Sequence, residues 1–169
     1  QSEIPLEAAK LSLGTDNLVM KIFTVFQERV EAFSEMIVRH VKVNRNQSPQ
    51  EALDATGRKR YADSEVVSEM LRGEGEEVDV YFFPLKKQTS ANDVDKMLEE
   101  RGLKPDPYAV VEVNKDDPNF SDSHPNGAQW KDNRGRHCCV AFDRWRGECE
   151  LDCGRSGDGW AGRWWLGGV

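Results

Sequence analysis

Long apolar runs are scarce in this sequence of 169 residues, and so are signals for export. The most apolar stretch, residues 18–26, is interrupted by Lys21 and Thr24 and is much shorter than the roughly 20 residues that a membrane-spanning helix needs. No basic, apolar and small-residue series opens the sequence in the manner of a signal peptide, although an N-terminal Gln leaves room for a removed segment. We therefore expect a soluble protein with one hydrophobic core and no membrane insertion.

Positive charge is also in deficit, since the formal net charge is −7. Residues 1–126 hold 16 Lys and Arg against 24 Asp and Glu, whereas residues 127–169 hold 7 against 6. General affinity for nucleic acid needs a basic face that displaces counterions, so we do not expect it. Arginines interleaved with tryptophans in the second part keep a single-strand nucleic-acid-binding module open as an alternative, although their acidic neighbours would repel phosphate.

Histidine is rare, which limits acid–base and metal chemistry. Of the three histidines only His137 lies beside cysteines, Cys138 and Cys139, and these adjacent residues lack the separation that lets zinc ligands converge. The Gly73 to Gly75 segment has no Lys-Ser or Lys-Thr at the position that a phosphate loop requires. The sequence therefore predicts no metal site, no cofactor and no enzyme activity.

Cysteine is confined to the last part of the chain. Residues 148–154 alternate between apolar and polar types, which predicts a half-buried strand with Cys149, Leu151 and Cys153 facing inward. The two cysteines would then lie about 13 Å apart, too far for a disulfide between them. Buried thiols favour a reducing, cytoplasmic compartment, with display on a virion or a cell surface as the alternative.

An amphipathic helix is predicted near the N-terminus. Apolar side chains recur at intervals of three and four from Val19 to Phe33, after the capping candidates Thr15 and Asp16, which predicts a helix over about residues 16–35. We expect residues 1–36 to pack on the following domain or to extend it. The apolar stripe also leaves open a homo-oligomer that forms through this helix.

The middle of the chain is predicted to be α+β. Strands are expected at residues 37–44 and 77–84, and short helices at residues 48–55, 63–71 and 90–101. The first of these helices opens with Ser48-Pro49-Gln50-Glu51, a capping residue followed by Pro at the first helical position. Residues 108–113 fit either a helix or an extended segment.

Aromatic residues change the character of the chain from Trp130 onward, because all five tryptophans lie there. Short strand-like pieces alternate with turn sequences at residues 133–135, 146–147 and 156–159. This pattern predicts an antiparallel β meander anchored by indole rings.

One pattern in this region resembles a known family. The frame consists of Trp130-Lys131-Asp132, Cys138 to Phe142, Arg144-Trp145, Arg155, Trp160, Trp164-Trp165 and Gly168-Val169. It resembles the C-terminal variable region of the target proteins of diversity-generating retroelements, in which an error-prone reverse transcriptase replaces adenines. Asn codons then become almost any residue, and Asp codons become Asp, Gly, Ala or Val.

The resemblance implies a C-type-lectin-like domain over residues 37–169, with residues 137–169 as the variable ligand-display region. Its scaffold residues would be Trp130, Arg144, Trp145, Arg155, Trp160, Trp164 and Trp165. The exposed ligand-binding positions would be Asp143, Arg146, Gly147, Asp152, Gly154, Ser156, Asp158, Gly159, Ala161 and Arg163, all reachable from Asn or Asp codons through adenine changes, with Glu150 as a surface neighbour that is not reachable.

The resemblance therefore implies a display protein that recognises an unknown macromolecular ligand, most simply a protein, through exchangeable surface side chains. A rigid scaffold suits this task because it lowers the cost of ordering a binding surface. A second alternative is an enzyme that resembles formylglycine-generating oxidases and uses Cys138 and Cys139 as redox residues.

Overall fold

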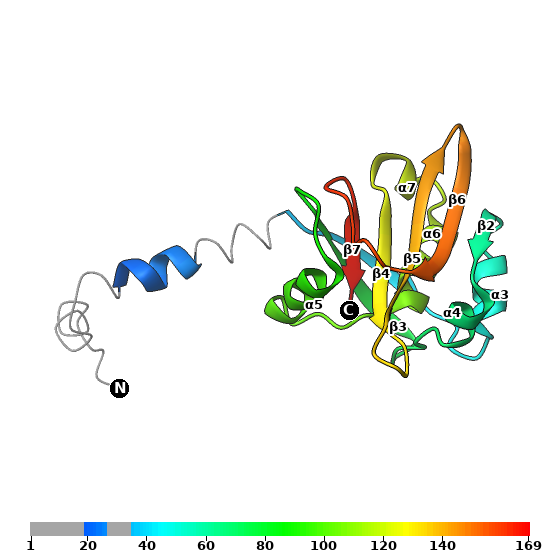
Figure 1. Cartoon of the computed structure of the whole chain (residues 1–169), viewed down its shortest axis with the longest axis horizontal. Helices are drawn as coiled ribbons and strands as arrows, with labels where there is room; N and C mark the ends of the chain where they lie inside the picture. The colour runs from blue at the N-terminus through cyan, green and yellow to red at the C-terminus, as the bar shows by residue number, and fades with distance from the viewer. Residues whose placement is uncertain (1–18, 27–34) are drawn as a thin grey trace. The chain divides into compact units, whose positions relative to one another are not determined.

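The computed structural model describes residues 19–26 and 35–169 (Figure 1). The chain divides between Met36 and Ile37 into two units, and each is described by itself. Residues 19–26 of the first unit are helical, whereas the rest of the predicted helix up to residue 34 lies outside the described residues. Within the described ranges, none of the helices has the length and apolar character needed to cross a membrane.

A seven-stranded mixed sheet forms the centre of the second unit. In sheet order its strands are β1 (Ile37–Lys42), β3 (Glu77–Pro84), β7 (Trp165–Gly168), β4 (Asn126–Lys131), β5 (His137–Trp145), β6 (Glu148–Arg155) and β2 (Lys59–Ala62). Neighbouring strands are antiparallel, except that β7 is parallel to β4 and β6 is parallel to β2. The unit is therefore a mixed α+β fold, as the sequence predicts.

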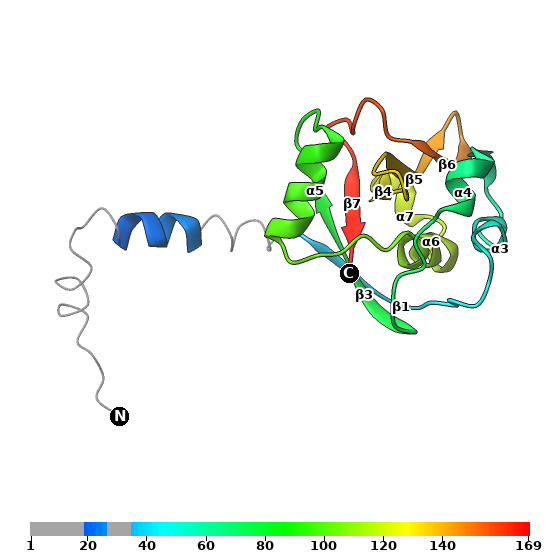
Figure 2. The same ribbon diagram turned by 60° about the horizontal axis from the view of Figure 1, so that its bottom comes forward.

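Helices lie on both faces of this sheet. They are α3 (Pro49–Asp54), α4 (Ser64–Ser68), α5 (Ala91–Glu100), α6 (Pro107–Asp116) and α7 (Phe120–Ser123). Two neighbouring glycines of β7 identify the two covered faces, because a Cβ at Gly167 would meet Val110 of α6 and a Cβ at Gly168 would meet Leu98 of α5. In Figures 1 and 2 α5 lies beside β7, away from the edge of the sheet to which β6 belongs.

The main hydrophobic core lies on the α6 face. Every residue of α6 from Pro107 to Asn114 is buried, and this helix contacts β1, β3, β4, β5 and β7. Strand alternation supplies the opposing side chains, such as Phe142 from β5 and Leu151 from β6, both fully buried. The sequence left residues 108–113 open between helix and extended structure, and burial on all sides explains why no amphipathic period marks them.

Several local predictions are confirmed. The side chain of Ser48 accepts a hydrogen bond from the backbone of Glu51 while the Glu51 carboxylate accepts one from the Ser48 backbone, with Pro49 at the first helical position of α3. Ser90 caps α5 in the predicted place. The predicted strands at residues 37–44 and 77–84 are β1 and β3.

The predicted C-terminal meander is only partly correct. Strands β4, β5 and β6 are consecutive antiparallel neighbours, as expected. The prediction is wrong for the last strand, because β7 leaves the meander and inserts between β3 and β4. It can do so because Gly167 and Gly168 have no side chains where Phe82 and Leu98 approach the strand closely.

Candidate functional site

An uncovered part of the sheet lies on the face opposite α6, at β5, β6 and β2. In the middle of β5 and β6 the alternate residues that face the core are buried, from Cys138 to Phe142 and from Leu151 to Cys153. On the other face Asp143, Glu150 and Gly154 are partly exposed and Asp152 is exposed. The period of two in the sequence therefore separates core positions from surface positions on the same strands. We call this surface of β5, β6 and β2 the open face.

A cleft of about 250 Å³ lies on the open face. Its lining residues are Tyr61, Ala141, Asp143, Trp145, Glu150, Asp152 and Trp164. Ala141 and Tyr61 lie opposite Asp152 on the two neighbouring strands, so the small Ala141 side chain leaves space beside the carboxylate. A second cleft of about 270 Å³ shares Trp164 with the first and is formed mainly by residues 155–160.

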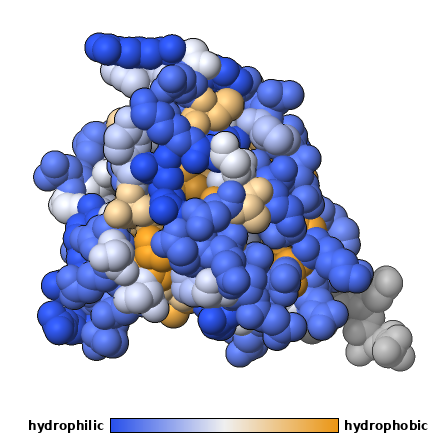
Figure 3. Space-filling model, turned by 90° about the vertical axis from the view of Figure 1, so that its right-hand side faces the viewer, coloured by the Kyte–Doolittle hydropathy of each residue, from blue (hydrophilic) through white to orange (hydrophobic). Residues whose placement is uncertain are grey.

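Aromatic side chains form walls of the first cleft. Tyr61 is 51% exposed and Trp145 is 52% exposed, while Trp164 is partly buried. The ring of Trp164 packs edge-on against Trp160 at a centroid distance of 5.4 Å, which fixes its position. Figure 3 shows the adjoining side of the molecule, which carries β2 and α3 and is mainly hydrophilic with small hydrophobic patches.

Three carboxylates give the cleft its charge. Asp143 and Glu150 lie directly opposite each other on β5 and β6, where like charges repel. Each has a cation nearby, since Arg163 Nη2 lies 3.3 Å from Asp143 and Lys59 Nζ lies 3.7 Å from Glu150. Asp152 has no hydrogen bond or ion pair within the described part of the chain. Its pKa is raised first by partial desolvation between the neighbouring side chains of the cleft and then by the charges of Asp143 and Glu150.

An ion network around the buried Asp132 carboxylate holds the strands beneath the open face. Asp132, at the end of β4, accepts hydrogen bonds from the guanidinium groups of Arg136 and Arg155, and its carboxylate also receives the backbone N–H groups of Arg134 and Arg136. Burial alone would raise the pKa of Asp132, but these hydrogen bonds outweigh it and hold the pKa well below its usual range. Arg155 thus joins β6 to the β4–β5 turn.

The predicted tryptophan anchors differ in their contacts. Trp130 lies in the core, and Trp160 donates a hydrogen bond of 2.9 Å to the buried side chain of Gln129. Trp160 also exchanges two backbone hydrogen bonds with Thr89, which ties the loop after β6 to the segment before α5. Trp165 packs edge-on against His124.

The exposure of Trp145 differs from what the predicted scaffold requires. Trp145 was expected to be a buried anchor, but it lies at the end of β5 beyond the reach of α6, and half of its side chain is exposed. Arg144, in contrast, has a bidentate ion pair with Asp122 and donates to the backbone carbonyl of Gly147. Arg144 therefore supports the hairpin, whereas Trp145 belongs to the cleft.

Two predicted display positions, Ser156 and Gly159, line the second cleft but are constrained by the fold. Ser156 is only 9% exposed, less than was expected of a display position, and its backbone N–H donates to the His137 carbonyl. Gly159 has a φ of +74°, and a Cβ there would lie 2.2 Å from the Thr89 carbonyl oxygen. Because the turn and the close approach both require glycine, Gly159 is a structural residue.

The remaining predicted positions lie at the surface. Exposed or partly exposed are Asp143, Arg146, Gly147, Glu150, Asp152, Gly154, Asp158, Ala161 and Arg163. The first cleft brings together Asp143, Glu150 and Asp152. Asp158 belongs to the second cleft, and Arg146 and Gly147 form the β5–β6 turn, away from both clefts.

Cysteine positions bear on the redox alternative. All four thiols are free. Cys138 and Cys139 point to opposite faces of β5, and burial raises the pKa of both, that of Cys139 to about 12. Cys153 is buried as predicted, while Cys149 is only partly buried. Thiols held in the protonated form are poor nucleophiles.

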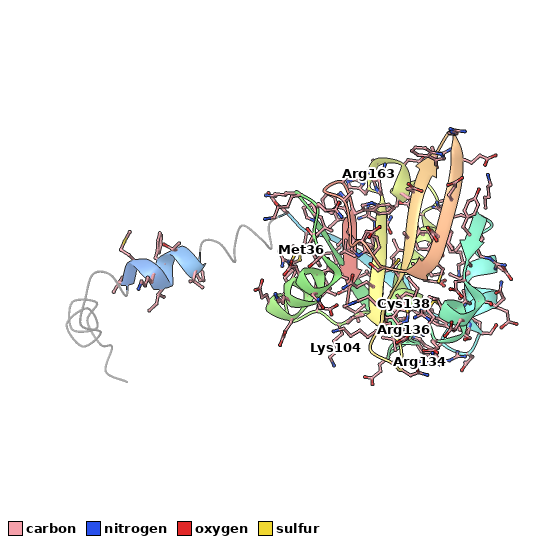
Figure 4. The ribbon with its side chains drawn as sticks, viewed as in Figure 1. Met36, Lys104, Arg134, Arg136, Cys138 and Arg163 are labelled. Carbon is pink, nitrogen blue, oxygen red and sulfur yellow. The ribbon has the colours of Figure 1, made fainter. Side chains whose placement is uncertain are left out.

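The arginines of the tail do not form a basic stripe. Figure 4 shows Arg163 at the opposite end of the sheet from Arg134 and Arg136. Arg136, Arg144, Arg155 and Arg163 each have an acidic partner. A nucleic-acid surface would need them aligned and unpaired, so this arrangement favours a different ligand.

His137 does not join the cysteines in a metal site. Its Nε2 lies 2.9 Å from Asp95 of α5, on the face opposite Cys138. Across residues 19–26 and 35–169, no three His, Cys, Asp or Glu side chains are grouped so that they could hold a metal ion.

Two lining residues were missed by the sequence analysis, Tyr61 and Ala141. Tyr61 lies on β2, which reaches the open face through a parallel pairing with β6. The alternation of residues 137–145 did carry a signal for Ala141, because it falls on the same face as Asp143.

Comparison of the chain with family models, with curated proteins and with solved structures gave no match.

Proposed function

We propose that this chain is a ligand-display protein with a C-type-lectin-like domain, which recognises a protein ligand through the open face. The observation that carries the proposal is the cleft on β5, β6 and β2, whose lining side chains are exposed or partly exposed while the strands beneath them are fixed by buried contacts. Exposed side chains on a rigid sheet can change at small cost in stability. Exposed tyrosine and tryptophan are also the residues most typical of binding surfaces.

The proposal includes diversification of these positions through a retroelement. Asp143, Asp152, Asp158 and Arg163 are exposed or partly exposed and are reachable from Asn or Asp codons through adenine changes. A nearby reverse transcriptase gene and a second, imperfect copy of the coding sequence for residues 143–163 would support it, provided that the mismatches are confined to adenines. Mismatches spread over all four bases would contradict it.

The display role is tested by unfolding. We expect the combined variant Asp152→Ala, Asp158→Ala and Arg163→Ser to unfold within about 5 °C of the parent, because three surface substitutions of no more than about 0.5 kcal/mol each change stability by at most about 1.5 kcal/mol. Ser156→Leu is the matched control from the same segment, and overpacking of this buried site should lower the midpoint by several degrees. A loss of many degrees for the surface set would overturn the display role.

Self-association through the N-terminal helix is part of the same proposal. Residues 19–26 expose Met20, Ile22, Phe23, Val25 and Phe26, each by more than half. A helix that is apolar nearly all round needs a partner surface, and a second copy of this helix supplies one of the same chemistry. Light scattering of the full chain should give a multiple of the 19.2 kDa chain mass, and Phe23→Asp with Phe26→Asp should give the monomer, whereas Lys21→Glu should not.

A further inference from the structure

We infer that the cleft of the open face binds a cationic side chain of the protein ligand, either the guanidinium group of Arg or the ammonium group of Lys, with Asp152 as its counter-ion. This inference rests on the proposed function and adds the chemistry of the ligand. It follows from the shape of the cleft, its walls and its carboxylates taken together.

The carboxylates of the cleft are not neutralised from within the protein. Three of them, Asp143, Glu150 and Asp152, lie on two adjacent strands, and among the described residues two cations, Arg163 and Lys59, form ion pairs with them. Lys59 lies nearer to Glu148, at 2.7 Å, than to Glu150. A positive group in the cleft above these two strands would reduce the repulsion between the carboxylates and would pair with Asp152.

The aromatic walls favour the same class of ligand. Tyr61 lies directly opposite Asp152 across the β2–β6 pairing, so one ring and one carboxylate border the same space. Ring faces attract cations, and an indole does so most strongly. A neutral donor could bond to the carboxylate but would gain little from the rings and nothing from the net charge, and an anion would be repelled.

Arg163 already makes this kind of contact inside the protein. Its guanidinium carbon lies 5.4 Å from the centroid of the Trp164 ring, and its Nη2 lies 3.3 Å from Asp143. An internal cation thus occupies one wall and one carboxylate of the cleft. Lys59 and Arg146 lie over the rings of Tyr61 and Trp145 in the same way, at 5.5 and 6.0 Å, so each ring of the cleft already attracts a cation. Asp152 is the carboxylate of the cleft that has no cation partner within the described residues.

The test uses the full chain and two small probes of the same shape, N-acetyl-arginine amide and N-acetyl-citrulline amide, which differ in charge. Binding is followed through the indole N–H resonances of Trp145 and Trp164 in a two-dimensional nitrogen–proton spectrum. We expect a saturable shift with the arginine probe in the millimolar range and binding of the citrulline probe weaker by about tenfold. N-acetyl-lysine amide tells whether the cleft prefers a planar or a compact cation.

Two variants separate the counter-ion from general electrostatics. Asp152→Asn should weaken the arginine probe by about tenfold, whereas Glu99→Gln removes one charge from the exposed face of α5 and should leave binding unchanged. Arg163→Ala should strengthen binding, because it frees Asp143 and Trp164. If Asp152 affected the probe only by supporting the folded sheet, Arg163→Ala would not strengthen binding.

Equal binding of the arginine and citrulline probes, or no indole shift with either, overturns the inference. An equal loss in Asp152→Asn and Glu99→Gln overturns it as well, because the attraction would then be non-specific. None of these results bears on the tolerance of the open face to substitution, so the display role stands or fails on its own unfolding experiment.

Discussion

The β5–β6 hairpin allows a sharp test of how a variable position interacts with the backbone. Arg146 and Gly147 are the two turn residues between Trp145 and Glu148, and their φ angles are +51° and +86°. Positive φ at both positions is the geometry of a type I′ turn, for which Asn-Gly is the preferred sequence. Arg146 therefore lies in a conformation that its side chain disfavours.

We expect Arg146→Asn to stabilise the protein by about 0.5 kcal/mol. Asn is several-fold more frequent than other residues in the left-handed region. This frequency corresponds to a conformational free energy at positive φ that is about 1 kcal/mol more favourable for Asn than for Arg. Against this gain stands the loss of the cation–π contact, since the Arg146 guanidinium carbon lies 6.0 Å from the Trp145 ring, and such an exposed contact contributes about 0.5 kcal/mol. Asn is also the residue from whose codon the family resemblance would derive this arginine.

The assay is thermal unfolding of the parent, Arg146→Asn and Arg146→Ala. Alanine loses the ring contact without gaining tolerance for positive φ, so it should be destabilised by about 0.5 kcal/mol. The two variants should differ by about 1 kcal/mol, which corresponds to about 3 to 4 °C for a unit of this size. An asparagine variant that is no more stable than the alanine variant would refute the assignment of backbone strain to this turn.

Three further changes test the site and its scaffold. Gly159→Ala should destabilise by more than about 2 kcal/mol, because its Cβ would meet the Thr89 carbonyl at a positive φ; a change within error in urea unfolding would contradict this. Trp160→Phe leaves the buried Gln129 oxygen without a donor and should cost about 1 to 3 kcal/mol, whereas a smaller loss would indicate that water replaces the indole. Asp152→Asn should raise stability at neutral pH, and the gain should vanish in acid, since a raised pKa favours the folded state only while the carboxyl is protonated. A gain that persists at low pH would count against the electrostatic cause.

Local signals in the sequence predicted the local structure well. The Ser48-Pro49 start of α3 and the Ser90 start of α5 were readable because a cap depends on neighbouring residues only. The alternation in β6 likewise predicted that Leu151 and Cys153 face inward. Turn residues at 146–147 marked the β5–β6 hairpin.

Pairings between distant segments were not readable. Strand β2 pairs with β6 across about 90 residues of sequence. Because no pattern in residues 59–62 indicates which strand they pair with, the sequence does not place Tyr61 in the site. Ser156 and Gly159 look like ordinary turn residues, and only the backbone of Thr89 and the surrounding packing make them fixed. The usual burial of indole rings predicts that Trp145 is an anchor, but β5 extends past the core at that point.

Strand register determines which positions of the open face are free to vary. On β6, Asp152 is exposed between the buried Leu151 and Cys153, so a shift of one residue would bury its carboxylate and expose both apolar neighbours. The register is held by the turn at Arg146 and Gly147 at one end of the hairpin and by the Arg155–Asp132 ion pair at the other. Variation at the turn therefore carries a cost that variation at Asp152 does not. If exposed positions are diversified, selection should tolerate many residues at Asp152 and few at Arg146, with those of Arg146 biased towards residues that accept a positive φ.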